Sequence, residues 1–407
     1  MEKRKVTYKM YPNKQQKACL LEALKLHHVV YNKALEERIK TYHEQGKSLT
    51  FVDQCKNLTK WRQTDPMLNN LNAQSLQVTL KRLDLAFKGF FRRLKAKEKA
   101  GFPRFKSFNR FSGWGYKTHG DGWGLLMDGN TQNGRLRLSG MGHIKIRGQA
   151  RTIGTPKTAE ILHKADKWYL SVTIECQATR ACGSKAVGID WGVETFVVSH
   201  NSTEETNPIE NPRHLKKMLP ELKQAQRAVS RKKKGSKSRR KAVSVVARLH
   251  HKIANRRKDF HHQVAARLIK ENSLIAYEAL SVKSMTARGG AYKRGLNREI
   301  LSTAPSQFHA ILKSKAEEAG AICIEIPTKE VKPSQTCHRC GRQEKKPLSE
   351  RKHACDCGAN CSRDENAARV ILNWALQWAS KSLGQELAEV RSHSNFVALK
   401  HETHAIP

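Results

Sequence analysis

Three acidic residues in this chain of 407 residues stand where predicted strands or helices begin or end, a common place for functional groups. In VGIDWG, the alternation of a strand puts Asp190 on the opposite face from Ile189, close to a glycine turn. Glu278 lies near the end of the apolar strand SLIAYEALSV and shares a face with Ala276. Asp364 begins the apolar stripe of a helix in SRDENAARVILNWA. Each carboxylate therefore sits at an element end, where it can be functional or simply exposed.

Asp364 has two interpretations. Ser362 and Glu365 fit an S-x-x-E capping box, and an acid in the first turn of a helix stabilises it by about 0.3 to 1 kcal/mol. Alternatively Asp364 is a metal ligand, because a buried carboxylate without a cation is costly. Together with Asp190 and Glu278 it matches the set of carboxylates that holds two Mg²⁺ ions about 4 Å apart for phosphodiester cleavage. Mg²⁺ prefers oxygen ligands and keeps several waters, so three side chains can suffice.

Five cysteines cluster near the C-terminus. Cys337 and Cys340 in TCHRCG are followed, after 14 residues, by Cys355 and Cys357 in ACDCGANC, with Cys361 four positions further on. Two close pairs across such a loop are typical of a zinc ribbon with tetrahedral thiolate ligation. The second pair has one intervening residue where two are usual. Cys355 and Cys357 are still the expected ligands, because a glycine follows Cys357 as another follows Cys340, and Cys361 is the substitute. Four thiolates leave no open position, so this Zn²⁺ is expected to be structural.

The charge of the chain predicts a polyanionic partner. Lys and Arg number 76 against 36 Asp and Glu, a net charge of +40 with a pI near 10.1. Residues 213–258 contain 18 Lys and Arg and one acid, Glu221, and RKKKGSKS interrupts them as the turn of a helical hairpin. No apolar run approaches the roughly 18 residues of a transmembrane helix, and the N-terminus has no signal-peptide core. We therefore expect a nucleic-acid-binding protein of the cytoplasm, associated with the nucleoid. The residues expected to contact phosphate are Lys232, Lys233, Lys234, Arg239 and Arg240.

Two architectures follow one another along the chain. An alternating strand at 3–11, helices at 15–43 and 72–97, and a glycine-punctuated antiparallel β unit at 120–178, such as a small barrel, make up the first. From about residue 185, short apolar strands alternate with helices, including a helix at 305–319 and a strand at 320–326. The sequence thus predicts a multidomain α+β protein whose second half is an α/β domain.

The motifs GIDWGVETF, IAYEAL and SRDENAA, with TCHRCG and CDCG before the last, closely resemble the three RuvC motifs and zinc ribbon of the TnpB family. YPNKQQ, LKRLDLAFKGFFRRLK, GFPRFKS, ENPRHLKK and RKKKGSKSRRKA extend the resemblance over most of residues 5–375. It implies an RNase H-like (RuvC) nuclease guided by an RNA from the transposon end, which cuts double-stranded DNA beside a short transposon-adjacent motif. Asp190, Glu278 and Asp364 are then the Mg²⁺-binding catalytic acids.

The resemblance also implies a domain order. A wedge-like β-barrel at 1–14 and 100–182 carries a helical recognition domain at 15–99, and a RuvC domain at 183–332 and 361–378 includes a helical hairpin at 213–270. A zinc ribbon at 333–360 and a flexible tail at 379–407 complete the chain, which is expected to act as a monomer. By position Gln77 and Thr118 match residues that read the adjacent motif, since Gln can pair with adenine in the major groove. Arg104 in GFPRFKSF is a further expected nucleic-acid contact.

Three alternatives remain at this stage. A nuclease-inactive RNA-guided repressor is disfavoured because acids stand in all three motifs. A stand-alone RuvC-like nuclease such as a junction resolvase would not need the long basic N-terminal half or the ribbon. A plain DNA-binding transposase predicts a nucleophilic Tyr or Ser site that the sequence does not reveal.

Overall fold

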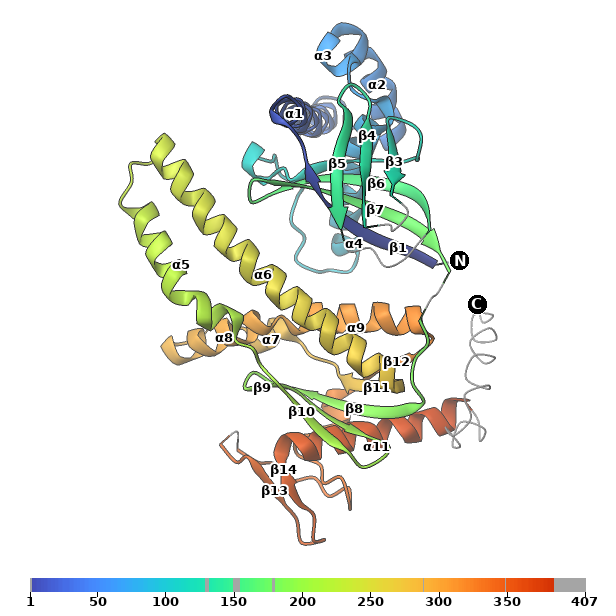
Figure 1. Cartoon of the computed structure of the whole chain (residues 1–407), viewed down its shortest axis with the longest axis vertical. Coiled ribbons are helices and arrows are strands. Elements are labelled where there is room, and N and C mark those ends of the chain that lie inside the picture. Colours follow the sequence, from blue (N-terminus) through green and yellow to red (C-terminus); the bar gives the residue numbers. More distant parts are fainter. Residues whose placement is uncertain are drawn as a thin grey trace. The chain divides into compact units, whose positions relative to one another are not determined.

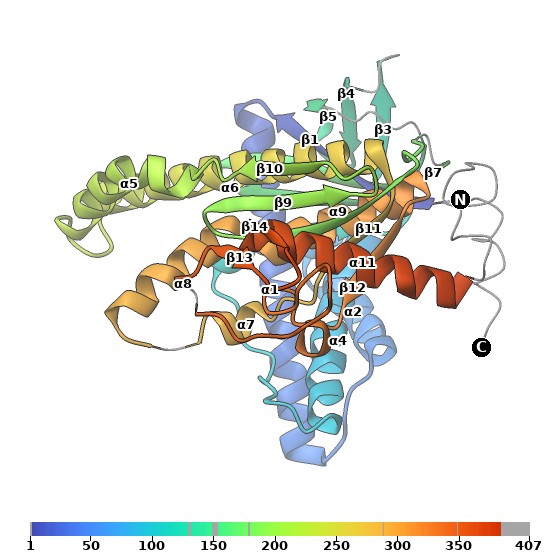
Figure 2. The same cartoon turned by 90° about the horizontal axis from the view of Figure 1, so that it is seen from below.

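The computed structural model describes residues 2–128, 132–148, 154–177, 180–287, 289–347 and 349–383 (Figures 1 and 2). The chain divides into two compact units, Met1–Gln177 and Ala178–Pro407, each with its own buried hydrophobic clusters. Among the helices in the described ranges, none combines the length and the apolar character of a membrane span.

The first unit contains a curled antiparallel sheet of seven strands in the order β2-β6-β7-β1-β5-β4-β3 (Figure 1). In β4, Leu136 and Leu138 are buried whereas Arg135 and Arg137 are exposed, so one face of the sheet packs on the core. This sheet occupies the region of the predicted barrel. Within the described residues its edge strands β2 and β3 are not paired with each other, so strand pairing does not close the sheet into a barrel. The strands are β1 (Glu2–Tyr11), β2 (Gly113–Tyr116), β3 (Trp123–Met127), β4 (Asn133–Leu138), β5 (Gly142–Gly148), β6 (Thr155–Lys164) and β7 (Lys167–Cys176).

Two long helices of this unit confirm the predicted helical segments. The first begins with a capping box between Asn13 and Gln16 and ends where Gly46 adopts a left-handed conformation with φ of 64°. Apolar residues of both helices, such as Leu24 and Leu80, are buried in the same cluster as Trp114 of the sheet, so helices and sheet share one core. The helices are α1 (Lys14–Gln45), α2 (Phe51–Thr64), α3 (Pro66–Asn69), α4 (Ala73–Lys95) and the 3₁₀ turn η1 (Phe108–Arg110).

The second unit contains a mixed sheet of five strands in the order β10-β9-β8-β11-β12. β8, β9 and β10 form an antiparallel meander, and β8, β11 and β12 run parallel. β9 and β11 consist almost wholly of buried residues, and in β8 the four residues from Ala186 to Ile189 are buried, as expected for a sheet covered on both faces. The strands are β8 (Lys185–Trp191), β9 (Thr195–Asn201), β10 (Thr206–Glu210), β11 (Asn272–Glu278) and β12 (Ile322–Ile326).

Helices cover this sheet on both faces (Figure 1). Residues of α6 and α9 pack on the face that carries Val187 and Ile189, whereas α11 packs on the face of Ala186 and Ala276. The predicted hairpin corresponds to α5 and α6, and the small hairpin of β13 and β14 leads into α11. The elements are α5 (His214–Ser230), α6 (Lys237–Glu271), α7 (Val282–Met285), α8 (Ala291–Thr303), α9 (Pro305–Ala319), α10 (Thr328–Val331), β13 (Lys352–Ala354), β14 (Asn360–Ser362) and α11 (Arg363–Leu383).

The structure differs from the sequence prediction in two places. α11 continues to Leu383, because Ala375 and Ala379 keep its apolar stripe buried against the sheet, so the predicted start of the tail at residue 379 falls within a helix. The rest of the predicted tail, residues 384–407, lies outside the described residues. The second difference is α8, which the sequence analysis did not anticipate.

Candidate active site and metal centre

Asp190 and Glu278 lie at the same edge of the second sheet because their strands are neighbours and run parallel. Ile189 of β8 pairs with Tyr277 of β11, and each acid is the next residue of its strand. Neighbouring strands lie about 4.8 Å apart, so the two backbones are close at this point. Strand alternation also puts both acids on the face of Ala276, which is the face covered by α11.

The third acid, Asp364, reaches this edge through close packing of α11 on β8. A Cβ added at Gly188, two residues before Asp190, would lie 2.6 Å from the main-chain nitrogen of Leu372 and closer still to the carbonyl oxygen of Ala368. Only glycine permits the helix backbone to approach the strand this closely. Asp364 precedes Ala368 by about one helical turn, so this contact brings the first turn of α11 towards the end of β8.

The start of α11 is capped without using Asp364. The hydroxyl oxygen of Ser362 accepts a hydrogen bond from the main-chain N–H of Glu365 at 3.1 Å. The Glu365 carboxylate accepts instead from Arg369 at 2.9 Å and from the Thr206 hydroxyl at 3.3 Å. The predicted cap by Ser362 is therefore present, and the carboxylate of Asp364 is available for another role.

The electrostatics indicate that the acids are close to one another. Burial, followed by the negative charges of Glu278 and Asp364, raises the pKa of Asp190 well above its usual range, and the positive charge of Arg363 opposes this. Burial also raises the pKa of Glu278. Half-buried acids that repel one another are unfavourable when all are ionised, and a divalent cation among them would remove that cost.

The three acids do not form a site for one tightly held ion. Within the described residues, the groups whose donor atoms all lie within 4.8 Å of one another are a set of four cysteines and a set of Cys337, His338 and His353. Two ions about 4 Å apart spread their ligands more widely than a single ion does, so a more open set of oxygens is compatible with the two-metal arrangement.

A broad cavity opens beside the acids. It has a volume of about 940 Å³, and Asp190 and Asp364 are among the residues that line it. Several cations also line it: Arg213, Lys216, Arg298, Arg351 and Arg363. Carboxylates that can hold cations, surrounded by side chains that attract anions, suit a phosphate ester as ligand.

Sequence reasoning missed two residues that support this site. Arg363 is buried, and its Nη1 donates to the main-chain oxygen of Pro347 at 2.6 Å, which ties the start of α11 to the preceding loop. Asn366 is fully buried, and its Oδ1 accepts from the main-chain N–H of His338 at 3.0 Å. In the sequence, only their closeness to Asp364 could have pointed to these two residues. Nothing in the local pattern shows that the start of this helix contacts the ribbon.

The cysteines form a second, compact centre. Sγ of Cys337 lies 3.6 Å from that of Cys357, and Sγ of Cys340 lies 3.6 Å from that of Cys355. A tetrahedral zinc with bonds of about 2.3 Å separates its sulfurs by about 3.8 Å, whereas a disulfide bond is about 2.05 Å. The four thiols therefore fit Zn²⁺, and Cys361 is not part of this set.

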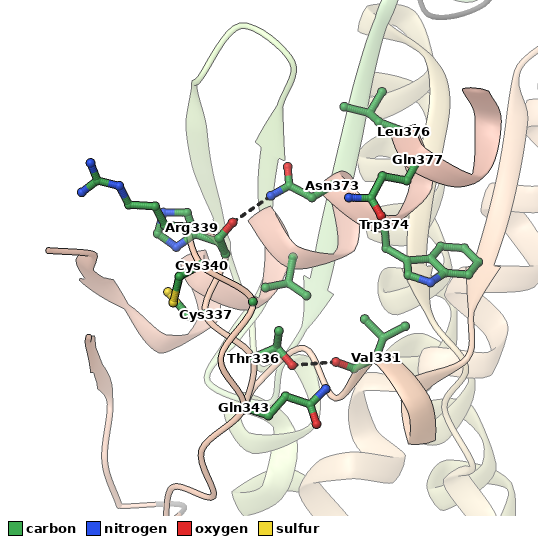
Figure 3. A pocket seen from close by; sticks show the side chains of 13 residues that line it. Val331, Thr336, Cys337, Arg339, Cys340, Gln343, Asn373, Trp374, Leu376 and Gln377 are labelled. Carbon is green, nitrogen blue, oxygen red and sulfur yellow. Dashed lines mark hydrogen bonds between the residues drawn. The ribbon is translucent and has the colours of Figure 1, made fainter. Parts of the chain in front are cut away.

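The cysteine centre is attached to α11 (Figure 3). The side chain of Asn373, on α11, donates to the main-chain oxygen of His338 at 3.0 Å. The Thr336 hydroxyl donates to the main-chain oxygen of Val331, on α10, at 2.8 Å. Between the ribbon and the helix lies a cavity of about 680 Å³, which Cys337 lines together with side chains of α11. Because the same helix carries Asp364, the ribbon supports the element that positions an acid.

The expected motif-reading residues lie in the first unit. Gln77 is exposed on α4, and Thr118 is exposed two residues after the end of β2. α4 packs on β2, because the side chain of Val78 on α4 lies against Gly115 of β2. Gln77 and Thr118 therefore belong to the same part of the unit. Arg104 is exposed in the segment that follows α4.

The expected phosphate contacts in the hairpin have different local roles. Lys233, Lys234 and Arg240 are exposed, and Lys232 is half-buried. Nη1 of Arg239 donates to the main-chain oxygen of Val229 at 2.8 Å and to that of Lys232 at 3.2 Å. Arg239 thus holds the turn between α5 and α6 together, which the sequence analysis did not foresee.

Models of known families match three parts of this chain. A model described as "Probable transposase" (OrfB_IS605) matches residues 169–288, and one described as "Cas12f1-like, TNB domain" matches residues 306–371. A third, described as a helix-turn-helix domain, matches residues 1–47, which here form β1 and the single helix α1. The matches therefore cover parts of both units.

Relatives extend over nearly the whole chain. A protein of Streptomyces pristinaespiralis named "Putative RNA-guided DNA endonuclease" is 33% identical over 96% of this chain and 94% of its own length. "Putative RNA-guided DNA endonuclease InsQ" of Escherichia coli (strain K12) is 29% identical over 84% of this chain and 85% of its own. The fold is similar to a cryo-EM structure of a Cas12f1–sgRNA–target DNA complex, with a TM-score of 0.60 and 15% identity over 89% of this chain and 83% of that one.

These features define a mixed α/β protein with a cysteine centre of the zinc-ribbon type and a fold similar to Cas12f1. The chain belongs to the TnpB family.

Proposed function

We propose that this protein is an RNA-guided DNA endonuclease of a transposon, which uses a guide RNA from the transposon end and cuts double-stranded DNA beside a short adjacent motif. The observation that carries this proposal is the placement of Asp190 and Glu278 on adjacent parallel strands, with Asp364 on the helix that covers the same face. The relatives named as RNA-guided DNA endonucleases support the same function.

The three acids are the proposed ligands of two Mg²⁺ ions in an RNase H-like (RuvC) site. Bound there, the ions would activate a water and stabilise the leaving oxygen. Asp190, Glu278 and Asp364 must be ionised to hold them. Lys216 and Arg351, which line the same cavity, would orient the phosphodiester by attracting its oxygens.

We assign recognition of guide and target to exposed basic residues, including those at the hairpin turn, and to the first unit. In RNA-guided nucleases base pairing reads the sequence, and the protein holds the heteroduplex through its backbone, which suits a net charge of +40. Exposed cations at the hairpin turn, such as Lys233 and Arg240, are proposed phosphate contacts. Gln77, Thr118 and Arg104 are proposed to contact the adjacent motif or its flanks.

The first test is purification from cells that express the transposon end together with the protein. We expect a copurifying RNA that directs Mg²⁺-dependent cleavage of a matching plasmid, by a protein that elutes as a monomer. A protein that cuts DNA fully after its RNA has been removed would instead be a stand-alone nuclease. A protein that binds the matched target without cutting it would be a repressor.

Motif reading has a separate test on a plasmid library with randomised positions beside the target. Gln77→Ala or Thr118→Ala is expected to relax the preferred bases, because a specific base contact is worth about 1 to 3 kcal/mol. Lys233→Gln is the matched control, since loss of a phosphate contact weakens all library members alike. An unchanged motif in both alanine variants would remove these two residues from the reading surface.

A further inference from the structure

A second cavity of the same unit has two helix faces as its walls. It has a volume of about 610 Å³ and lies between α6 and α8, with Leu215 of α5 at one side. Its lining residues are spaced at i, i+3, i+4 and i+7 on both helices, so each helix turns one complete face towards it. They are His250, Ile253, Ala254 and Arg257 of α6, and Arg294, Asn297, Arg298 and Leu301 of α8.

The charges on these two faces have one sign. Arg257, Arg294 and Arg298 line the cavity, together with His250 and with Ser302 near the end of α8, and among the described residues no carboxylate lines it. Arg298 also lines the cavity of the acids, and its Nε lies 3.4 Å from the carboxylate of Glu299 there, whereas Arg257 and Arg294 do not line that cavity. Like charges on facing helices repel, and an anion between them would convert the repulsion into attraction.

Arg257 shows that part of this charge is poorly solvated. Its Nη1 donates to the main-chain oxygen of Ser302 at 3.2 Å, while its Nε is buried and has no hydrogen-bond partner among the described residues. Burial lowers the pKa of Arg257. A guanidinium held in this way lacks the carboxylate that normally accompanies a buried arginine.

The rest of the lining is apolar. Leu215, Ile253, Ala254 and Leu301 supply it, and Leu301 is 55% exposed at the rim. Apolar walls beside arginines suit a ligand that has both an anionic group and a flat or aliphatic part. A nucleotide within a single strand has this combination, with its phosphodiester for the arginines and its sugar and base for the leucines.

We propose that the cavity between α6 and α8 binds a phosphodiester group of a single nucleic-acid strand, at a place that adjoins the cavity of the acids through Arg298 and is distinct from the hairpin turn. The proposal rests on the proposed function only in requiring that the protein binds nucleic acid. It does not depend on cleavage, so the two can fail independently.

The test measures binding of a labelled single strand in EDTA, by fluorescence anisotropy over a range of salt concentrations, with RNA and DNA of the same sequence. The variant is R294Q, since Arg294 is exposed, does not line the cavity of the acids and can be changed without emptying a core. The matched control is K313Q, which removes one exposed charge from the same unit on α9, away from both cavities.

The arginine variant is expected to bind about threefold more weakly and to lower the slope of log K against log salt by about 0.7, the value for one lost phosphate contact on a single strand. The control should keep the slope of the native protein. A larger loss with RNA than with DNA assigns the cavity to the guide, and the reverse assigns it to the target. Equal losses in the arginine variant and the control would overturn the proposal.

Discussion

The two candidate metal centres of the second unit are assembled in different ways. The four cysteines come from residues 337–357, and their sulfur atoms all lie within 4.8 Å of one another. The three acids come from positions 190, 278 and 364, and meet only because β8 and β11 pair in parallel and α11 packs on Gly188. One centre is therefore a property of a short segment, and the other is a property of the whole unit.

This difference affects how each centre responds to damage. A compact thiolate site gains its stability from the metal, because its segment has little core of its own. The acid site is held by a sheet and helices that are buried without any metal, and its acids oppose that stability through burial and mutual repulsion. We expect metal loss to unfold the first centre and to stop only the chemistry of the second.

Loss of one of the acids should affect cleavage more strongly than any other change affects its readout. Asp190→Ala should reduce Mg²⁺-dependent cleavage at least about 1000-fold, because removal of one member of a catalytic set disables the set. RNA and target binding, measured by gel shift, should remain. Glu194→Gln is the matched control, since Glu194 lines the same cavity but is exposed and its ion pair with Arg213 is long, at 4.0 Å. Cleavage retained by the Asp190 variant would remove this residue from the site.

The cysteine centre should respond in stability. Cys337→Ser is expected to release zinc, seen as loss of about one metal per chain, and to lower the melting temperature. Cys361→Ser should retain the metal, because Cys361 lies outside the set of four thiols. Zinc lost from the Cys361 variant and kept by the Cys337 variant would show that the ligand set is wrong.

A smaller effect connects the two centres to the packing of α11. Gly188→Ala places a methyl group against the helix backbone, so we expect a loss of about 1 to 3 kcal/mol in stability and a fall in cleavage as Asp364 moves away. Zinc content should not change. Gly89→Ala in α4 is the control, because apart from the neighbouring backbone of its own helix nothing lies within 4 Å of the added Cβ. Full cleavage by the Gly188 variant would show that α11 does not set the position of Asp364.

The smallest effect concerns pH in the metal-free protein. Because the folded-state pKa of Asp190 is raised, its contribution to stability is fully present below the usual pKa of an aspartate and is lost as the pH rises through the raised value. Asp190→Asn removes that loss. In EDTA the variant should therefore melt above the native protein near pH 8, and less so near pH 4.

Mg²⁺ should change the melting temperature only of the protein that keeps Asp190. Added near pH 8, it should raise the melting temperature of the native protein but not that of the D190N variant, because binding to the folded state alone is stabilising. Equal melting temperatures of native protein and variant in EDTA at both pH values would show that Asp190 is not repelled by its neighbours.

Sequence patterns predicted elements where one periodic signal dominates. The helices at 15–43 and 72–97 and the hairpin at 213–270 were confirmed, because their apolar residues recur at helical spacing and turn residues mark their ends. α8 was missed because its face towards the second cavity carries Arg294, Asn297 and Arg298, which give no apolar stripe. The roles of Arg239 and Arg363 were missed because their partners are main-chain oxygens of neighbouring turns.

The amino-acid sequence alone determined the cysteine centre, the basic character and the family motifs, since these depend on residue type and on spacing over a few positions. Tertiary structure decided which acids face one another, because strand pairing and the register of a helix at Gly188 bring together residues far apart along the chain. It also decided that arginines of α6 and α8 share a cavity. Spacing along a chain fixes neighbours within a turn, whereas proximity between elements follows from how their buried faces pack.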